Sequence, residues 1–538
     1  MEQFDYVIVG AGSAGCAVAE RLSRDSTKRV LLLEAGGSDR NFWIKTPIGY
    51  GKTFYDPSVN WRYTTEPDPG LNMREIYWPR GKVLGGSSSI NAMVYSHGVP
   101  GDYDDWEAAG NPGWGWSSVS RTFRRLECRV GEDATSKTGP YLWVEDRVRE
   151  MHPVRRYFAD AAREIGLPEA SDVNGDTPEG FGAYQFTTHR GRRFSAADAF
   201  LRPALKRRNL VLRTGVSIRR VDVAEGRVTG VSYRDAGGTD TSVQAGETIL
   251  CAGAIGTPLI LQASGIGPGG LLQDRGIRVR MENAAIGANL QDHLGISYFY
   301  RASEPTLNHV LGTWAGRISI GLRYLLFRTG PMSLSVNQMG GIVRSDPEKE
   351  HPDLQLYFNP ISYSVEKKGK REIFQPDPYP GFIMGFNSCR PTSHGKVSIA
   401  ASGDPTDAPK IEPNYLSTDK DRRDAVAGGR LIARLSATEA MREFIVGTPK
   451  ADPNQMSDQE ILADFRARSS TVFHACGTCR MAPREDGGVV DPRLRLYGLD
   501  GIRIADASVF PNITSANTNA PAILVGVKAG DIIAGNSV

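Results

Sequence analysis

The sequence has few of the features that mark membrane-spanning, nucleic-acid-binding or disulfide-rich proteins. Its 64 lysines and arginines nearly balance 61 aspartates and glutamates, so it carries no basic footprint for nucleic acid. No apolar run is long enough to span a bilayer, and a strand-like segment begins within a few residues of Met1, so no secretory signal is expected. The 538 residues include only six cysteines, mostly isolated. These features predict a cytoplasmic protein with reduced thiols.

Glycine, by contrast, is abundant, and three glycines near the N-terminus form a motif. Residues 4–9 are a short β-branched run, typical of a buried parallel strand, and lead directly into Gly10, Gly12 and Gly15. The G-x-G-x-x-G spacing allows a tight turn, close approach of a pyrophosphate and close packing of the following helix. The N–H groups of that helix N-terminus would face the phosphates.

An acidic residue completes this pattern. A second strand-like segment, residues 29–36, contains Glu34 nineteen residues after Gly15. A carboxylate near this spacing accepts hydrogen bonds from a ribose diol and repels a ribose 2′-phosphate. Chance glycine matches are common in a chain with 60 glycines, but here strand, helix, strand and acid follow in the required order. The segment predicts a dinucleotide site that disfavours NADP.

A second glycine-rich stretch, PRGKVLGGSSSINAMVY at residues 79–95, contains three consecutive serines. Its backbone can curl around an anion and its hydroxyls can bond to that anion. The apolar residues that follow at once, from Ile90 to Val94, argue against a merely flexible turn. The preceding residues 36–81, rich in Pro, Gly and aromatics, are typical of an ordered loop that covers a large flat group or packs onto the core.

A further G-x-G-x-x-G match, formed by Gly265, Gly267 and Gly270, does not predict a second nucleotide site. The segment before it follows a Thr-Pro pair at 257–258, which is typical of a helix start. These glycines are therefore expected to end a helix instead of following a strand. No acid closes a second strand about twenty residues later.

The GAGSAG motif, Glu34 and GKVLGGSSSIN at residues 81–91 together resemble the glucose-methanol-choline (GMC) oxidoreductases, flavoproteins that oxidise alcohols with FAD. Similar landmarks follow along the chain, namely GAIGTPLILQASGIG (253–267), GANLQDH (287–293) and FHACGTCRM (473–481). The resemblance implies an α/β fold in which a Rossmann-like, doubly wound FAD-binding domain carries an inserted α+β substrate domain with an antiparallel sheet. Strand-like alternation at 354–358, 381–387 and 396–400 agrees with that sheet.

The resemblance also divides the chain into two discontinuous domains. Residues 1–150, 190–295 and 455–538 are expected to form the FAD-binding domain. Residues 151–189 and 296–454 are expected to form the substrate-binding domain.

Candidate site residues follow from the same resemblance. His474 would be the general base, and the ordinary pKa of histidine near working pH suits proton transfer. Asn519 stands where the family has His or Asn and would hold the substrate oxygen with its side-chain N–H, with neighbouring Asn517 as the alternative. The residues implied to hold FAD are Gly10, Gly12, Ser13, Ala14, Gly15, Glu34, Ala35, Val83, Gly86, Asn91, Ala92, Met93, Val94, Val216, Ala252, Asp506, Ala507 and Thr518.

Four further residues bear on the FAD linkage, on a metal or redox site, and on the scaffold around the base. Some relatives tether FAD through a histidine at the position of Ile90, and since isoleucine cannot form that bond, FAD is predicted to be non-covalent. Cys476 and Cys479 form C-x-x-C, but no second pair with metal spacing accompanies them, so no metal site is expected. Their context also differs from that of a thioredoxin-like site. His293 is expected to be a hydrogen-bonded scaffold residue.

Residues 311–327 predict an amphipathic helix with three arginines nearby. Its apolar face is formed by Leu311, Trp314, Ile318, Leu322 and Leu325. The simpler interpretation is a helix packed on the antiparallel sheet. The alternative is a basic amphipathic face that makes weak peripheral contact with a membrane.

The implied reaction is oxidation of a small-molecule alcohol to the carbonyl, with proton abstraction by His474 and hydride transfer to flavin N5. Electrons would then pass to O2 or to a quinone-type acceptor. A flavin-containing hydroxynitrile lyase of the same fold is the alternative. The family more often has Pro-Val where this chain has Ala475 and Cys476, which leaves the substrate open among aliphatic alcohols, choline, sugars and aryl alcohols.

Overall fold

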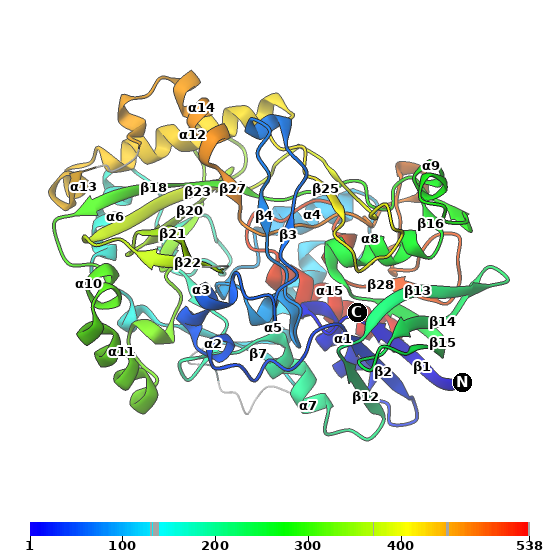
Figure 1. Cartoon of the computed structure of the whole chain (residues 1–538). Coiled ribbons are helices and arrows are strands. Elements are labelled where there is room, and N and C mark those ends of the chain that lie inside the picture. The colour runs from blue at the N-terminus through cyan, green and yellow to red at the C-terminus, as the bar shows by residue number, and fades with distance from the viewer. Residues whose placement is uncertain (130–131, 133–138, 369–370, 448–450, 536–538) are drawn as a thin grey trace.

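The chain folds around two large β-sheets that lie in different halves of the molecule (Figure 1). This computed structural model describes residues 1–129, 132, 139–368, 371–447 and 451–535. The mixture of a largely parallel sheet, an antiparallel sheet and covering helices confirms the predicted α/β class. No helix in these described ranges is both long and apolar enough to traverse a bilayer.

The first sheet has seven strands, and its parallel centre is built from apolar residues. β2 (Val30–Glu34) is buried along its whole length, and β1 (Glu2–Val9) ends in three buried residues. Such runs suit strands covered on both faces. The order is β12 (Leu210–Thr214), β2, β1, β15 (Asp240–Leu250), β14 (Arg227–Arg234) and β13 (Ser217–Ala224), with β28 (Ile502–Ile504) paired to β15. The sheet thus joins strands from both ends and from the middle of the chain.

Two helices from opposite ends of the chain pack together beside this sheet. α1 (Ser13–Leu22) follows β1, and α15 (Asn519–Ile533) is buried from Ala520 to Asp531. A Cβ at Gly526 would lie 2.4 Å from the Ala14 carbonyl oxygen, so only glycine permits this close crossing. The N-termini of the two helices also meet, because Ser13 Oγ of α1 donates to Asn519 Oδ1 of α15 at 2.8 Å.

The second sheet has six strands and is antiparallel. Its order is β19 (Met339–Val343), β20 (Leu354–Asn359), β23 (Gly381–Ser388), β18 (Leu294–Ala302) and β26 (Ile445–Gly447), with β27 (Ser470–Thr471) paired to β18. Aromatic side chains such as Tyr298, Phe382 and Phe386 fill its core. The helices around it are α6 (Arg155–Glu164), α12 (Asp419–Ser436), α13 (Glu439–Phe444) and α14 (Asp458–Arg468).

Smaller elements connect these two halves. A four-stranded sheet contains β5 (Val94–Tyr95), β9 (Gln185–Phe186), β7 (Leu142–Asp146) and β6 (Glu127–Arg129). Two-stranded pairs are β3 (Tyr63–Thr64) with β4 (Tyr77–Trp78), β10 (Thr188–His189) with β11 (Arg192–Arg193), β16 (Ile266–Gly267) with β17 (Met281–Glu282), β21 (Tyr363–Lys368) with β22 (Arg371–Pro376), and β24 (Lys396–Ser398) with β25 (Lys410–Glu412). The remaining helices include α2 (Phe42–Lys45), α3 (Tyr50–Thr53), α4 (Pro100–Ala108), α5 (Trp116–Leu126), α7 (Arg202–Ala204), α9 (Gly269–Asp274), α10 (Leu307–Gly312) and α11 (Trp314–Phe327).

The helix predicted to start at the Thr-Pro pair begins earlier. α8 spans Gly253–Ala263 and contains Pro258 in its interior. Pro258 cannot donate to the Ala254 carbonyl one turn before it, but Thr478 Oγ1 donates to that oxygen at 2.6 Å. The helix therefore continues through the proline because a distant residue replaces the missing donor. Gly265, with a φ of +79°, follows the end of α8, as expected.

The amphipathic helix at 311–327 is not packed on the antiparallel sheet in the predicted way. The segment breaks at Thr313 into α10 and α11, and Thr313 caps the second helix by accepting from Gly316 N. Most of the predicted apolar face of α11 is exposed, and the helix is buried only at Ile320 and Tyr324. The simpler interpretation of this helix was therefore wrong.

The proposed domain boundaries stay a prediction. The seven-stranded sheet lies within the three segments assigned to the FAD-binding domain. However, α14, inside the predicted segment 455–538, packs on α12 of the predicted substrate-binding domain.

Candidate active site

The N-terminal glycine motif forms a tight turn between β1 and α1. Gly10 has a φ of +101°, and a Cβ there would meet the Cys251 carbonyl oxygen at 2.5 Å. A Cβ at Gly15 would lie 1.9 Å from the Gly10 carbonyl oxygen. A Cβ at Gly12, in contrast, would meet no protein atom within 4 Å. Gly10 and Gly15 are therefore required by the protein's own packing, whereas Gly12 borders open space.

Backbone donors surround this open space. Cys16 N donates to the Gly12 carbonyl, which begins the helical hydrogen bonding, and Gly12 offers no side-chain cap. Within the described part of the chain, the N–H groups of Ser13, Ala14 and Gly15 donate to no protein acceptor. Unpaired N–H groups at a helix N-terminus, together with the helix dipole, stabilise a bound anion.

The second glycine-rich loop closes over the first. Gly85 N donates to the Ala11 carbonyl at 2.8 Å, and Val83 forms a parallel bridge with Gly37. Gly86 has a φ of +53°, and a Cβ there would lie 2.7 Å from Gly12 Cα. The two glycine motifs, separated by about seventy residues in sequence, are therefore in backbone contact.

The carboxylate of Glu34 is hydrogen-bonded to the backbone of the first loop. Its Oε2 accepts from Ala11 N and its Oε1 from Gly36 N, both at 2.8 Å. Burial raises its pKa, although these backbone donors oppose the shift. The Glu34 carbonyl accepts from Val216 N at 3.1 Å, so the predicted ribose-binding acid and the predicted adenine-side residue are neighbours. Ala35 lies between Glu34 and Gly36 at the end of β2.

A second group of predicted cofactor residues surrounds the start of α8. Asp506 Oδ2 accepts from Gly253 N at 2.8 Å and from Thr257 Oγ1 at 2.6 Å. Ala252 immediately precedes that helix, and Ala507 begins a short 3-10 turn after Asp506. Burial raises the pKa of Asp506, again opposed by its hydrogen bonds.

The remaining predicted cofactor residues lie on the segment that leads into β5. Asn91 Oδ1 accepts from Arg193 Nη1 at 2.7 Å and from Met93 N at 3.1 Å. Met93 has a φ of +63°, which holds the chain in a left-handed kink at this point. Ala92 stays partly exposed beside it, and Val94 enters β5.

The two asparagines considered for the second catalytic role have different partners in the structure. Asn519 begins α15, and its Oδ1 accepts from Ser13 Oγ at 2.8 Å, at the N-terminus of α1. The side chain of Asn517 instead lies beside the predicted base, with 3.0 Å between its Nδ2 and His474 Nε2. Thr518 occupies the position where the loop turns into the helix, so the asparagines on either side of it face different partners. The structure thus pairs His474 with Asn517 and places Asn519 at the nucleotide loop.

The orientation of Asn517 is set from the antiparallel sheet. Gln355 Nε2 on β20 donates to Asn517 Oδ1 at 3.2 Å. Because the amide oxygen accepts from Gln355, the amide nitrogen faces His474. One N–H of this amide contacts the imidazole, and the other is available to a further acceptor.

Hydrogen bonding assigns the protons of His474. His293 Nε2 lies 2.8 Å from the Cys389 carbonyl oxygen, which can only accept, so this nitrogen carries a proton. In neutral His293 the Nδ1 must then accept, and it lies 2.9 Å from His474 Nδ1. His474 therefore carries its proton on Nδ1, which leaves a lone pair on Nε2 beside Asn517.

Burial keeps both imidazoles neutral. Desolvation lowers the pKa of His474 well below its ordinary value, and the neighbouring His293 and the buried Arg80 lower it further. Burial lowers the pKa of His293 to about 4. Neutral His293 is what the proton assignment requires, so geometry and electrostatics agree.

The GANLQDH stretch holds the loops that carry the site. Asp292 Oδ1 accepts from His474 N at 2.7 Å, while its Oδ2 accepts from Tyr415 and Thr471 hydroxyls at 2.5 Å each. Gln291 bridges Cys476 through its backbone and accepts from Ile513 N through Oε1 at 2.9 Å. One short segment therefore fixes both the histidine loop and the asparagine loop.

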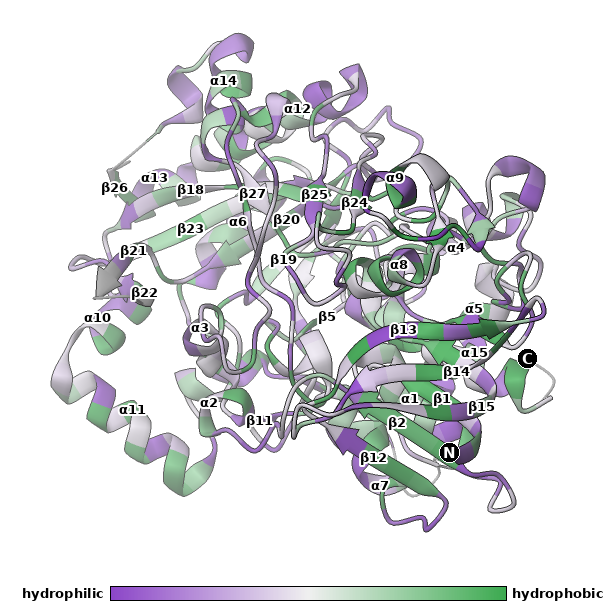
Figure 2. Ribbon diagram, turned by 45° about the vertical axis from the view of Figure 1, so that its right-hand side comes forward, coloured by the Kyte–Doolittle hydropathy of each residue, from purple (hydrophilic) through white to green (hydrophobic). Residues whose placement is uncertain are grey.

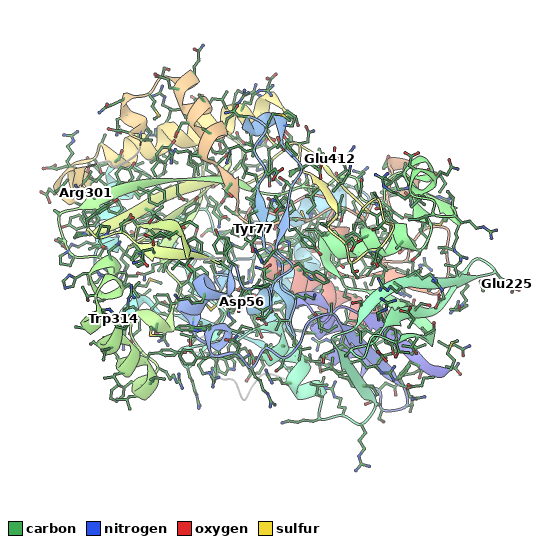
Figure 3. The ribbon with its side chains drawn as sticks, viewed as in Figure 1. Asp56, Tyr77, Glu225, Arg301, Trp314 and Glu412 are labelled. Carbon is green, nitrogen blue, oxygen red and sulfur yellow. The ribbon has the colours of Figure 1, made fainter. Side chains whose placement is uncertain are left out.

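The residue before His474 is held in an uncommon conformation. Phe473 has a φ of +73°, and its carbonyl oxygen accepts from Arg80 Nη1 at 2.7 Å. The Phe473 ring packs against Phe54, which also contacts Tyr77. Tyr77 lies centrally in the molecule, between the two sheets (Figure 3). The aromatic region at 36–81 thus forms ordered structure next to the base.

Several residues of this site were missed by sequence reasoning. Gln355 and Tyr415 lie far from His474 in sequence and belong to no motif, and Arg80 lies in the second glycine-rich stretch with no sign of a contact to the histidine loop, so only the fold brings them near. Asp292 had a detectable signal, because it directly precedes His293 in a family-like stretch. His293 is hydrogen-bonded as expected, but its partner is the base itself.

The C-x-x-C pair sits below the site as two separate thiols. Cys476 and Cys479 are buried and form no disulfide, and the same holds for the other four cysteines. Burial raises the pKa of both thiols well above the ordinary value. In the described ranges no three His, Cys, Asp or Glu side chains are grouped so that they could hold a metal ion.

The buried histidines predict a specific loss of stability in acid. Above about pH 6.5, where unfolded histidine is neutral, burying His293 carries no protonation cost. As pH falls below 6.5, His293 binds a proton in the unfolded chain, whereas in the native state it stays neutral until about pH 4. The free energy of unfolding therefore falls over this pH range. His293→Gln keeps a donor for the Cys389 carbonyl but has no imidazole to protonate. We expect its free energy of unfolding to fall by about 3 kcal/mol less than that of wild type between pH 7 and pH 4.

Urea unfolding of both proteins at pH 7, 6, 5 and 4 measures this difference. Buried acids such as Asp292 and Asp506 titrate in both proteins, so the comparison isolates the imidazole. Parallel pH profiles of the two proteins would contradict a neutral, buried His293.

Comparison with known proteins places the chain in a family. Family models described as GMC oxidoreductase match residues 4–295 and residues 391–526. The chain belongs to the GMC oxidoreductase family. It is 39% identical to alcohol dehydrogenase (acceptor) from Pseudomonas putida, over 98% of this chain and 95% of the relative. It is 38% identical to oxygen-dependent choline dehydrogenase from Rhizobium etli, over 99% of this chain and 96% of the relative.

Solved structures extend the likeness to the whole fold. Pyridoxine 4-oxidase from Mesorbium loti is similar with a TM-score of 0.87 at 28% identity, covering 99% of this chain and 100% of the other. A formate oxidase reaches a TM-score of 0.89 at 26% identity, over 99% and 98% of the two chains. This GMC oxidoreductase is accordingly an FAD-dependent enzyme.

The residues present fit FAD. The unpaired N–H groups of α1 and the open surface at Gly12 suit a pyrophosphate, and Glu34, which lies at the end of β2 and accepts from Ala11 N, suits a ribose. Ser13 at the N-terminus of α1 donates to Asn519 at the N-terminus of α15, so both helix N-termini border the first glycine loop.

Proposed function

We propose that this GMC oxidoreductase oxidises an alcohol to the carbonyl compound with His474 as general base and Asn517 as the residue that holds the substrate oxygen. The observation that carries this proposal is the pair formed by His474 Nε2 and Asn517 Nδ2, 3.0 Å apart. An acceptor lone pair and an amide donor side by side are the two groups that an alcohol hydroxyl needs during deprotonation. A small alcohol would replace their direct contact with its own oxygen between them.

Each residue then has one task. His474 Nε2 takes the hydroxyl proton, while its Nδ1–H stays directed at His293. Asn517 donates an N–H to the developing alkoxide and keeps its oxygen on Gln355. FAD supplies the hydride acceptor for the carbon that becomes the carbonyl carbon. Low polarity around the buried pair strengthens both hydrogen bonds to the oxygen.

The depressed pKa of His474 has a functional consequence. The free imidazole stays neutral, and so available as a base, to a pH well below the ordinary histidine pKa. His293 acts as a positioning residue, because it fixes the tautomer that leaves Nε2 unprotonated. A substrate oxygen bearing negative charge beside Nε2 favours the protonated form at the moment when the proton moves.

The electron acceptor, the FAD linkage and the location are separate inferences. Relatives of this chain are named alcohol dehydrogenase (acceptor) and oxygen-dependent choline dehydrogenase. We therefore infer that O2 or a quinone-type compound is the electron acceptor. We infer non-covalent FAD, because Ile90 offers no nucleophile to the cofactor. We infer a cytoplasmic location, because all six cysteines are buried and none forms a disulfide.

Anaerobic mixing with a panel of alcohols tests the reaction. We expect one substrate class to bleach the flavin absorbance, and admission of air to restore it rapidly for an oxidase or slowly for a dehydrogenase. Absence of bleaching with every alcohol, combined with cyanide release from a cyanohydrin, would replace this proposal by hydroxynitrile lyase activity.

The two asparagines have separable roles. Asn517→Ala removes the donor to the substrate oxygen, so flavin reduction is expected to slow by about 100-fold with FAD binding unchanged. Asn519→Ala removes the acceptor of Ser13 Oγ, so FAD is expected to bind more weakly while the bound fraction reacts at nearly the wild-type rate. Stopped-flow reduction and flavin titration of both variants measure the two effects. The reverse pattern would restore Asn519 as the catalytic residue.

A further inference from the structure

Helix α11 exposes an unusual amount of apolar surface. Trp314, Leu326 and Phe327 are 80%, 71% and 70% exposed, and three further large apolar residues of this helix are more than half exposed. Trp314, Ile318, Leu322 and Leu325 follow a spacing of four, four and three residues, which aligns them along one face. Figure 2 shows hydrophobic residues along α11 although the helix lies at the edge of the molecule.

The helix is held to the protein by its opposite face. Ile320 and Tyr324 are its two buried residues, and they lie one turn apart on the side away from the exposed stripe. Trp314, at the start of α11, lies at the periphery of the molecule (Figure 3). The exposed stripe is thus firmly anchored and directed outward.

The charged residues on the segment that contains this helix are of one sign. Residues 306–345 contain no aspartate or glutamate but carry Arg317, Arg323, Arg328 and Arg344. Arg323 contacts Glu150 at 3.2 Å and Arg344 contacts Glu179 at 3.0 Å. Arg317 donates to the Leu311 carbonyl, and Arg328 stacks on Tyr324. In the described residues no carboxylate forms an ion pair with Arg317 or Arg328, so both keep a free positive charge.

We propose that α11 is a membrane-contact helix that lies in the headgroup layer of an anionic lipid surface. An apolar stripe with arginines beside it is the pattern of an interfacial helix, whose aliphatic and aromatic side chains enter the acyl boundary while cations remain among the phosphates. At fourteen residues the helix is about 21 Å long, which suits an orientation parallel to the surface. Trp314 at one end is a residue that favours the lipid–water interface.

The charge pattern favours lipid over a second copy of the chain. In a twofold-symmetric dimer through α11, Arg317 and Arg328 of one copy would lie near Arg317 and Arg328 of the other, and these like charges would repel. No acidic residue in 306–345 is available to neutralise them. An anionic surface supplies the missing negative charge. This inference does not depend on the proposed reaction.

Vesicle flotation of the FAD-loaded, full-length enzyme tests the proposal. The probes are vesicles of phosphatidylcholine with phosphatidylglycerol, and vesicles of phosphatidylcholine alone. We expect binding to the anionic vesicles that weakens at high salt, and at least tenfold weaker binding to the neutral ones. Leu322→Ser/Leu326→Ser is expected to reduce anionic binding by about tenfold or more. Arg317→Gln is expected to reduce it several-fold.

Control substitutions and a second measurement separate the alternatives. Val446→Ser changes an equally exposed apolar residue on β26 and is expected to leave binding unchanged. Flavin content and melting temperature of the α11 variants should match wild type, because the changed side chains are exposed. Absence of vesicle binding by wild type, or binding that survives Leu322→Ser/Leu326→Ser, would overturn the proposal. Sedimentation showing a dimer that this double variant dissociates would also overturn it, in favour of a second copy as the occupant.

Discussion

His474→Ala is expected to bind FAD with normal affinity and to lose flavin reduction by about a thousandfold or more with the substrate that reduces wild type. The reason is local: the change removes the acceptor lone pair beside Asn517, and the hydrogen-bond partners of His474 in the described residues, Asn517, His293 and Asp292, lie outside the two glycine loops. Anaerobic stopped-flow spectroscopy of the flavin band measures the loss, and flavin titration measures binding.

Two controls make this result specific. His351→Ala removes a surface imidazole that is 56% exposed and is expected to reduce flavin at the wild-type rate. Added imidazole is expected to restore part of the rate of His474→Ala, because it can fill the space vacated by the side chain and take the proton. Reduction within tenfold of wild type in His474→Ala would remove the base role from this residue.

The second large effect is expected at Gly12. Gly12→Ala should leave the stability of the FAD-free protein within about 0.5 kcal/mol of wild type, yet weaken FAD binding by about 100-fold or more. The backbone at Gly12 has a φ of −79°, which any residue adopts, and its Cβ would touch no protein atom. The added methyl group would instead occupy the space that the pyrophosphate needs.

The remaining glycines provide contrasts for this test. Gly270→Ala, in the second G-x-G-x-x-G match, also places a Cβ in open space and is expected to change neither stability nor FAD binding. Gly15→Ala would place a Cβ 1.9 Å from the Gly10 carbonyl oxygen and is expected to destabilise the fold itself. Thermal unfolding without FAD and flavin titration separate these outcomes. Unchanged FAD affinity in Gly12→Ala would place the pyrophosphate elsewhere.

The membrane-contact helix and the active site illustrate different limits of sequence reasoning. The apolar and basic pattern of α11 was visible in the sequence, and both a packed and an exposed face agreed with it. Whether Trp314 and Leu322 meet a sheet or solvent depends on where β18 and β20 lie, and periodicity carries no such information. The break at Thr313 and the capping bond to Gly316 decide how the helix leaves the sheet.

The choice between Asn517 and Asn519 shows the same limit at finer scale. Both asparagines stand within one family-like stretch, and the resemblance favoured Asn519, whereas the structure places Asn517 beside His474. The turn at Thr518 directs the two side chains to different partners, and Gln355, about 160 residues earlier, orients Asn517. Local sequence does not encode such a partner, because the contact exists only once two distant segments have folded together.

The sequence by itself determined the family, the class of fold, the use of FAD and the identity of the histidine proposed as base. These follow from local constraints: a buried strand, a glycine turn, a helix start and an acid must occur in fixed order and spacing, so they are written in consecutive residues. Only the tertiary structure decided which nitrogen of His474 carries the proton, which asparagine faces it and which helix face meets solvent. Those properties depend on the Cys389 carbonyl, Gln355 and the packing of α11, groups that become neighbours through long-range folding and through no sequence spacing.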